Sequence, residues 1–228
     1  MNTKDYVLGA LSGFLMGVFL LPTFSFLNIH IKDMIAPIAT SVGVALPAGF
    51  SNTWLLGVIP VIWLLGILLG RILSVKIPFM IQFARYVAAG FLSFSIDFAV
   101  YNILLSYFGV TSGPKLVLSK GISFMTGNFN AYTWNHFWVF GDKRDPNESI
   151  LKEYGRFLSV SVVGLVINVA VTVFFTDIIG VRGGFTPEAW ANIAGVIAVA
   201  AVILWNFAGY KLIVFKKKQL AIPVVSSR

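Results

Sequence analysis

Residues 86–108 read YVAAGFLSFSIDFAVYNILLSYF, and residues 157–179 read FLSVSVVGLVINVAVTVFFTDII. Both stretches are almost wholly apolar, and a helix needs about 20 such residues to cross the hydrocarbon core of a bilayer. Each therefore predicts a membrane-spanning helix. Four further runs of this kind bring the expected number of spans to six, and they lie at 6–28, 53–75, 118–140 and 190–214.

The composition of the chain favours the same fold class. Of its 228 residues, 57% are hydrophobic and 11% are charged, whereas soluble domains contain about 25% charged residues. We therefore predict an all-α polytopic membrane bundle. The net charge of +8 does not indicate a nucleic-acid partner, because the basic residues flank the apolar runs and form no basic stripe.

The chemistry that the sequence offers is limited. The chain has no Cys, two His and no GxxxxGK[ST] motif, so we expect no metal site, no cofactor and no nucleotide-driven pump. No nucleophile–base pair or carboxylate dyad is visible, and we therefore do not expect an enzyme.

The N-terminal part of the chain, 1–84, is predicted to form a two-helix extension. Within it, the segment 33–51 is apolar but contains Pro37 and Pro47. A broken helix exposed to lipid would leave backbone groups without hydrogen bonds. We therefore expect an interfacial or re-entrant segment here and not a seventh span. The stretch 77–84 is expected to form a short interfacial connector.

Basic residues gather at one set of helix ends. Thirteen of the 17 Lys and Arg residues fall on one side of the predicted bundle: Lys4, Arg71, Lys76, Arg85, Lys143, Arg144, Lys152, Arg156, Lys211, Lys216, Lys217, Lys218 and Arg228. The other four are Lys32, Lys115, Lys120 and Arg182. Because cytoplasmic loops retain Lys and Arg, we predict a multi-pass protein of the plasma membrane with both termini cytoplasmic. Residues 219–228 then form a cytoplasmic tail.

The last four predicted helices contain an internal repeat. One shift of the sequence places Arg85 on Arg156 and the third span on the fifth, and a slightly longer shift places Asn135 on Tyr210 and the fourth span on the sixth. The two copies, 85–140 and 156–215, each contain an even number of spans and run in the same direction. We therefore expect a pseudo-two-fold axis along the membrane normal to relate them.

A stripe of small and polar residues recurs in register. Gly90, Ser93, Asp97 and Tyr101 share one helical face, and Ser161, Gly164, Asn168 and Thr172 share the matching face of the fifth span. Small residues in such stripes also serve simply to let helices approach closely. Asp97 is different, because an ionisable group at mid-span costs about 3 kcal/mol unless it faces a partner or water. We therefore expect Asp97 to face a partner, a substrate group or water.

The stretch from Arg85 to about Lys218 resembles the GtrA-like family. In that family the second helix of each hairpin ends on a motif close to Asn-Phe-x-x-Asn-Arg-x-Trp-x-Phe. The first copy keeps Asn135, Trp138 and Phe140 and has His136 where the motif has Arg. The second copy ends in a comparable way, and it keeps Asn206, Phe207, Lys211 and Phe215. The expected domain therefore covers residues 85–218.

The resemblance implies movement of a polyprenyl-phosphate-linked monosaccharide across the membrane, for the synthesis of a cell-surface polysaccharide or related glycan. The expected partners are that sugar lipid, the surrounding membrane lipids, a glycosyltransferase and further copies of the chain, because four short helices enclose little space. One alternative is a non-transporting anchor that recruits a glycosyltransferase. Another is a small proton-coupled cation exchanger in which Asp97 is the counter-ion.

The candidate substrate-binding residues fall into two groups. Cationic or titratable groups near the cytoplasmic face are expected to hold the phosphate, and they are Arg85, His136, Arg156 and Lys211, with Asn135 beside them in the motif. Polar groups within the spans are expected to line a groove for the sugar, and they are Asp97, Asn128, Asn168 and Asn206. The alternative roles are membrane anchoring for the cations and interhelical hydrogen bonding for the polar groups.

Overall fold

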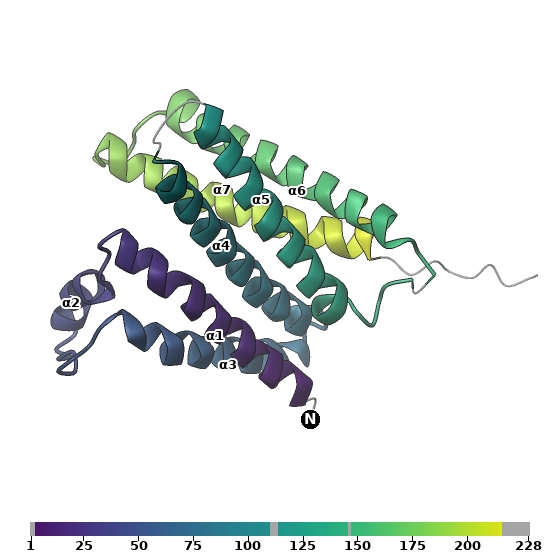
Figure 1. The fold of residues 1–228 in the computed structure, drawn as a ribbon, viewed down its shortest axis with the longest axis horizontal. Coiled ribbons are helices and arrows are strands. Elements are labelled where there is room, and N and C mark those ends of the chain that lie inside the picture. Colours follow the sequence, from purple (N-terminus) through teal and green to yellow (C-terminus); the bar gives the residue numbers. More distant parts are fainter. Residues whose placement is uncertain (1–2, 110–113, 146, 216–228) are drawn as a thin grey trace, which may run out of the picture. The chain divides into compact units, whose positions relative to one another are not determined.

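The computed structural model describes residues 3–109, 114–145 and 147–215. In these residues helices alternate with turns and no strand is present, which confirms the predicted all-α fold (Figure 1). The predicted cytoplasmic tail at 219–228 lies outside the described residues.

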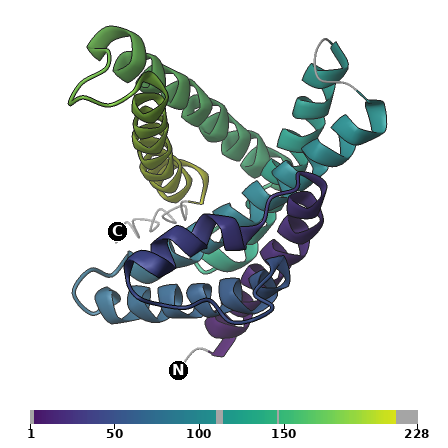
Figure 2. The same ribbon diagram turned by 90° about the vertical axis from the view of Figure 1, so that its left-hand side faces the viewer.

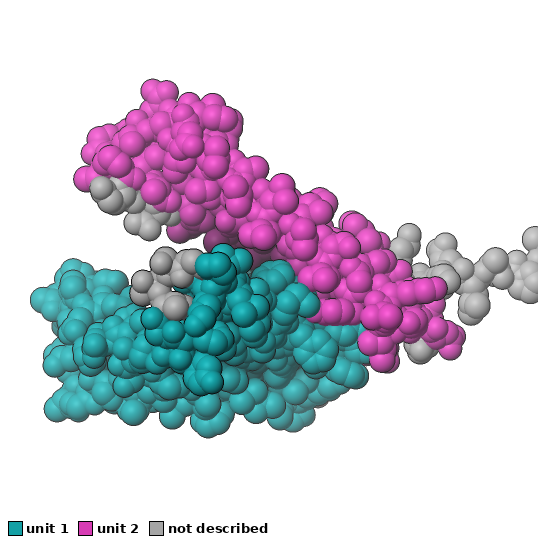
Figure 3. Space-filling view, turned by 45° about the horizontal axis from the view of Figure 1, so that its top comes forward, with its two compact units in different colours: residues 1–139 teal, residues 140–228 magenta. Residues whose placement is uncertain are grey.

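The chain forms two compact units, residues 1–139 and 140–228, shown in teal and magenta in Figure 3. The boundary falls at the end of the first predicted repeat. The first unit therefore combines the N-terminal extension with the first hairpin of the repeat, and the second unit contains the second hairpin.

The extension is a hairpin of two long helices. Helix α1 (Thr3–Phe26) packs along α3 (Leu55–Ser74), and Figure 1 shows the two side by side. Between them lie the short helix α2 (Ile31–Ser41) and the single turn η1 (Asn52–Trp54). Helix α2 has 11 residues, about half the length that a span requires. Its location at the membrane interface stays a prediction.

Three glycines allow α1 and α3 to approach closely. Gly9, Gly13 and Gly17 are spaced by four residues and so lie on one face of α1. A Cβ atom at Gly13 would lie 2.7 Å from the Cα atom of Pro60 in α3, far inside van der Waals contact. This arrangement is the small-residue packing that is typical of membrane helices.

We expect Gly13→Ala to lower the free energy of unfolding by about 1–3 kcal/mol, because an added methyl group has no space there. Gly66→Ala is the matched control, since a Cβ atom at Gly66 meets no atom within 4 Å. The control should leave stability unchanged or raise it slightly, because Ala favours the helix over Gly. Thermal unfolding in detergent measures both, and equal midpoints would contradict the close packing at Gly13.

The first hairpin of the repeat consists of α4 (Met80–Phe108) and α5 (Pro114–Trp134), and α5 continues as a π-helical turn, η2 (Asn135–Val139). The prediction of a connector over 77–84 is wrong for its second half, because α4 already begins at Met80. The reason lies in packing, since a Cβ atom at Gly70 of α3 would lie 2.6 Å from the Cβ atom of Ala84. The first turns of α4 are therefore packed against α3.

The second hairpin consists of α6 (Ile150–Val173) and α7 (Pro187–Gly209), the green and yellow-green helices of Figure 2. Helix α6 continues as the π-helical segment η3 (Phe174–Ile179), and α7 as η4 (Tyr210–Val214). Five helices of the described chain are long and apolar enough to cross a membrane, which confirms a polytopic membrane fold. Helix α5 is not among them, so the sixth span stays a prediction.

Candidate functional site

Arg85, the first of the predicted phosphate-binding cations, is held by a carboxylate of the extension. Its Nη2 donates to Asp5 Oδ2 at 2.6 Å, and the indole Nε1 of Trp138 donates to Asp5 Oδ1 at 3.2 Å. The pair is largely buried, with side-chain exposures of 15% for Arg85 and 5% for Asp5. Two donors of the first hairpin thus converge on one anionic group.

Arg156, the matching residue of the second unit, makes a comparable contact at a more open place. Its Nη2 donates to Glu148 Oε2 in the loop before α6 and to the backbone oxygen of Val214 at 2.9 Å. The Arg156 side chain is 39% exposed. The guanidinium therefore holds a carboxylate and the end of η4 at the same time.

The second helix of each hairpin ends in a π-helical turn. The two turns, η2 and η4, begin at Asn135 and Tyr210, which are the residues that the sequence repeat places on one another. In each turn the last backbone oxygen accepts a side-chain hydrogen bond from the first helix of its hairpin. Gln82 Nε2 donates to Val139 O at 3.1 Å, and Arg156 donates to Val214 O. π-helical turns often occur at functional sites.

The other predicted residues at these helix ends are exposed to different degrees. His136 is buried, and its Nδ1 lies 3.2 Å from the hydroxyl of Tyr132. Asn135 is also buried and donates to the backbone oxygen of Ala131 at 2.8 Å. Lys211 is half-buried, with its Nζ 5.8 Å above the centre of the Phe207 ring. Of the four titratable groups, His136 is thus buried, whereas Arg85, Arg156 and Lys211 are each partly exposed.

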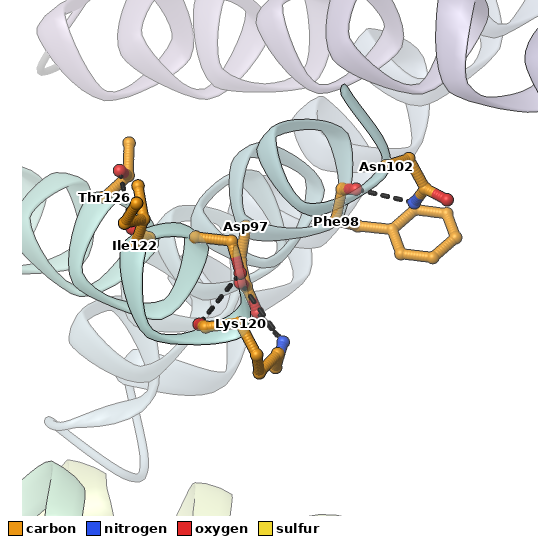
Figure 4. A network of polar contacts seen from close by, with 7 residues as sticks. Asp97, Phe98, Asn102, Lys120, Ile122 and Thr126 are labelled. Carbon is orange, nitrogen blue, oxygen red and sulfur yellow. Dashed lines mark hydrogen bonds and ion pairs between the residues drawn. The ribbon is translucent and has the colours of Figure 1, made fainter. Parts of the chain in front are cut away.

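Asp97 faces a cationic partner on the neighbouring helix of its hairpin. Lys120 Nζ of α5 donates to its Oδ2 at 2.9 Å and to its Oδ1 at 3.2 Å, and Figure 4 shows the two side chains turned toward one another. The same ammonium lies 5.2 Å from the centre of the Tyr101 ring. The cost of a charge at this depth is therefore reduced by a partner.

The predicted polar stripe of α4 faces α5 along much of its length. Ser93 Oγ accepts a hydrogen bond from Asn130 Nδ2 at 2.9 Å, one turn from the Asp97 pair. Gly127 of α5 lies between them, and a Cβ atom there would be 2.9 Å from the Asp97 Cβ atom. Asn128, the next residue of α5, is buried. We call this contact between α4 and α5 the first seam.

A second seam lies between α6 and α7. The hydroxyls of Ser161 and Tyr210 lie 2.7 Å apart, and Phe157 stacks on the Tyr210 ring. Asn206 packs against Gly164, where a Cβ atom would lie 2.6 Å from its Oδ1. Asn168 is half-buried. Asn206 is thus brought into the seam, whereas in the described residues no hydrogen bond joins the Asn168 side chain to α7.

The two seams differ in charge. The alignment of the two repeats places Asn168 opposite Asp97 and Gly195 opposite Lys120. The second hairpin therefore lacks both members of the ion pair, and its helices pack without it. The second hairpin thus shows that two such helices can pack without an ion pair at this place.

Sequence reasoning did not include four residues that shape these sites, namely Asp5, Gln82, Lys120 and Glu148. Lys120 was assigned to the outer set of cations at a helix end, but α5 begins at Pro114 and contains it. The cost of Asp97 at mid-span was a signal that a cation had to lie nearby. Asp5 carried a weaker signal, as the one acidic residue of the first turn of α1.

Comparison with known proteins identifies the family. The model of the GtrA/DPMS transmembrane domain matches residues 85–215, which is more than half of the chain and coincides with the two hairpins. No solved structure matches the chain significantly. The match includes both arginines, both π-helical turns and both seams, and it leaves the extension outside. The chain therefore belongs to the GtrA/DPMS transmembrane domain family.

Proposed function

We propose that this chain moves a polyprenyl-phosphate-linked monosaccharide across the plasma membrane for the synthesis of a cell-surface glycan. One observation carries the proposal: Arg85 and Arg156, at matching positions, each hold a carboxylate through Nη2. A guanidinium binds carboxylate and phosphate with the same planar donor geometry. Each hairpin therefore begins with a group suited to the anionic phosphate of such a lipid.

Capture of the lipid begins at Arg156 in this proposal. Its guanidinium is partly exposed and its carboxylate partner, Glu148, belongs to a loop, so a phosphate replaces Glu148 at modest cost. Lys211, on the same unit, adds a second cation near the predicted cytoplasmic face. Arg85 is less accessible, because Asp5 and Trp138 enclose it. His136 is buried and supports its helix end in place of meeting the lipid directly.

Passage of the sugar requires polar groups within the membrane, since burying hydroxyls without hydrogen bonds costs several kcal/mol. Each seam supplies such groups, and the amides that we assign to sugar binding are Asn128 in the first hairpin and Asn168 and Asn206 in the second. The prenyl tail stays in lipid along the exposed apolar surface of the hairpins. Both features fit a lipid whose head and tail need different environments.

Two other functions compete with this one. The second candidate is an anchor that recruits a glycosyltransferase, which is the alternative that membership of the GtrA/DPMS transmembrane domain family leaves open. A proton-coupled cation exchanger fits less well, because Asp97 already has a resident cation in Lys120. Substrate binding separates the exchanger from the two lipid-linked functions.

The test is equilibrium binding to the purified chain in detergent, with a C10 isoprenyl phosphate glucose as the probe. We expect it to bind, and a C10 isoprenyl phosphate to displace it better than the neutral C10 alcohol. Preference for the phosphate follows from the charge-assisted hydrogen bonds of Arg156. Binding that ignores the phosphate, or displacement by a lipophilic cation, would overturn the proposal.

The topology gives a separate prediction. Because the chain has no Cys, single cysteines introduced at Asp142 and Phe185 report one loop each. We expect a membrane-impermeant thiol reagent to label Asp142→Cys from the cytoplasm and Phe185→Cys from outside, as the distribution of Lys and Arg requires. Labelling of Asp142→Cys from outside would reverse the orientation.

A further inference from the structure

We infer that Lys120, Asp97 and Tyr101 form a binding site for the phospho-sugar head group in the half of the first hairpin that is predicted to face outward. In this site Lys120 holds the phosphate, Asp97 accepts hydrogen bonds from sugar hydroxyls, and the Tyr101 ring covers the sugar. The inference rests on the proposed function and adds a second binding position beyond the arginines.

The contacts leave the ammonium able to bind a further anion. Lys120 Nζ has three donors, and both of its contacts with acceptors go to the two oxygens of Asp97. Its side chain is 56% exposed, whereas that of Asp97 is 20% exposed. One side of the ammonium is therefore held by Asp97 and Tyr101 while the other side is open. The carboxylate lowers the cost of keeping this cation ready within the membrane.

The depth of the pair argues against simple anchoring. Lys120 follows Pro114, the first residue of α5, by six residues, and Asp97 precedes Phe108, the last residue of α4, by 11. At 1.5 Å per residue the two lie about 9 and 16 Å from those helix ends. A lysine that only anchors a helix is expected at the interface itself, with its ammonium among the lipid head groups. Here the ammonium is instead bonded to a group well inside the hairpin.

The second hairpin supplies an independent argument. Asn168 and Gly195 stand at the matching positions, and α6 and α7 still pack as a hairpin. The ion pair is therefore not needed to hold two such helices together. A pair of charges that the fold does not need, at a depth where charges are costly, indicates a binding function.

The chemistry of the three groups selects the ligand class. A cation next to a carboxylate and an aromatic ring suits a ligand that has one negative charge and several hydroxyls on a ring. A free phosphate would favour two cations, and a neutral sugar would not need Lys120. The head group of a sugar lipid combines a singly charged phosphodiester with the hydroxyls of a sugar ring. The ligand class is therefore a sugar phosphodiester.

The test compares three variants in binding of C10 isoprenyl phosphate glucose and in transport of a labelled polyprenyl-phosphate glucose. Lys120→Arg keeps the cation and the pair. Asp97→Asn with Lys120→Ala removes both charges, as in the second hairpin, with Ala at the place of Gly195 so that the helix is kept. Asp97→Lys with Lys120→Asp restores the ion pair in the opposite orientation, so that a purely structural pair is preserved while the binding site is reversed.

We expect Lys120→Arg, which keeps the cation, to lose less affinity and transport than either double variant. Both double variants should fold but lose about tenfold or more in affinity and in transport rate, because neither keeps a cation at position 120 to bond the phosphate. If the reversed pair or the neutral pair works as wild type does, the inference is overturned and the pair is structural. If the reversed pair does not fold, the neutral pair decides alone. Failure of the wild-type chain itself to bind the probe would instead overturn the proposed function.

Discussion

Asp5→Ala should lower the free energy of unfolding of the first unit by about 3–5 kcal/mol, which is the usual cost of removing one partner of a buried ion pair. The variant leaves the Arg85 guanidinium enclosed without a counter-charge, and it also removes the acceptor of the Trp138 indole. Denaturant or thermal unfolding of the purified chain in detergent measures the change. The extension should therefore separate from α4 at a lower temperature or denaturant concentration than in the wild-type chain.

Glu148→Ala is the matched control, because Glu148 holds the equivalent arginine of the second unit. This pair is more open, with side-chain exposures of 39% for Arg156 and 18% for Glu148, so its loss should cost less, on the order of 1 kcal/mol. A stability loss for Asp5→Ala no larger than that of Glu148→Ala would contradict a structural role for the Asp5 contact. The comparison also gives the extension a role, since it would supply the anion that a buried arginine of the family domain requires.

Arg156→Gln should weaken the binding of C10 isoprenyl phosphate glucose about a hundredfold, because two charge-assisted hydrogen bonds to the phosphate are lost. The fold should change little, since a glutamine amide can donate to the backbone oxygen of Val214. Gln82 makes that bond to Val139 O at the end of the first hairpin. Isothermal titration or native mass spectrometry of the detergent-solubilised chain measures the affinity.

Two companions make this result specific. Arg156→Lys keeps the charge but loses the planar pair of donors, so its affinity should lie between those of wild type and Arg156→Gln. Glu148→Gln removes the competing carboxylate and should bind the probe more tightly than wild type. Equal affinities for wild type and a stable Arg156→Gln variant would return Arg156 to membrane anchoring. The double replacement of both arginines is less informative, because Arg85→Gln leaves Asp5 buried without a cation.

The helices themselves could be predicted from the sequence, because their length and apolar composition are local properties. The start of α4 could not, since the apolar stretch 77–84 fits an interfacial connector and a helix equally well. The packing of Ala84 against Gly70 decides between them, and Gly70 belongs to a different helix, α3. The same holds for the face of α1 that contains Gly9, Gly13 and Gly17, because no local pattern identifies its partner on α3.

The candidate site was predictable to a similar extent. Asp97 was found because a charged residue is rare and costly within a span, and Arg85 and Arg156 were found because the internal repeat places one on the other. Their partners were not, because an ion pair such as Arg85 with Asp5 joins residues 80 positions apart. Lys120 shows the limit clearly: counting basic residues placed it at a helix end, whereas the start of α5 at Pro114 brings it inside the hairpin beside Asp97.

Leaflet accessibility of a labelled polyprenyl-phosphate glucose, measured in vesicles that contain only the purified chain, separates translocation from binding alone. A membrane-impermeant reagent that modifies the sugar reports the fraction in the outer leaflet over time. If the chain translocates the lipid, the whole pool becomes accessible in wild-type vesicles, at a rate that falls in the Arg156→Gln variant. If only the outer-leaflet fraction reacts, as in vesicles without protein, while the probe still binds, the chain is an anchor and translocation is contradicted.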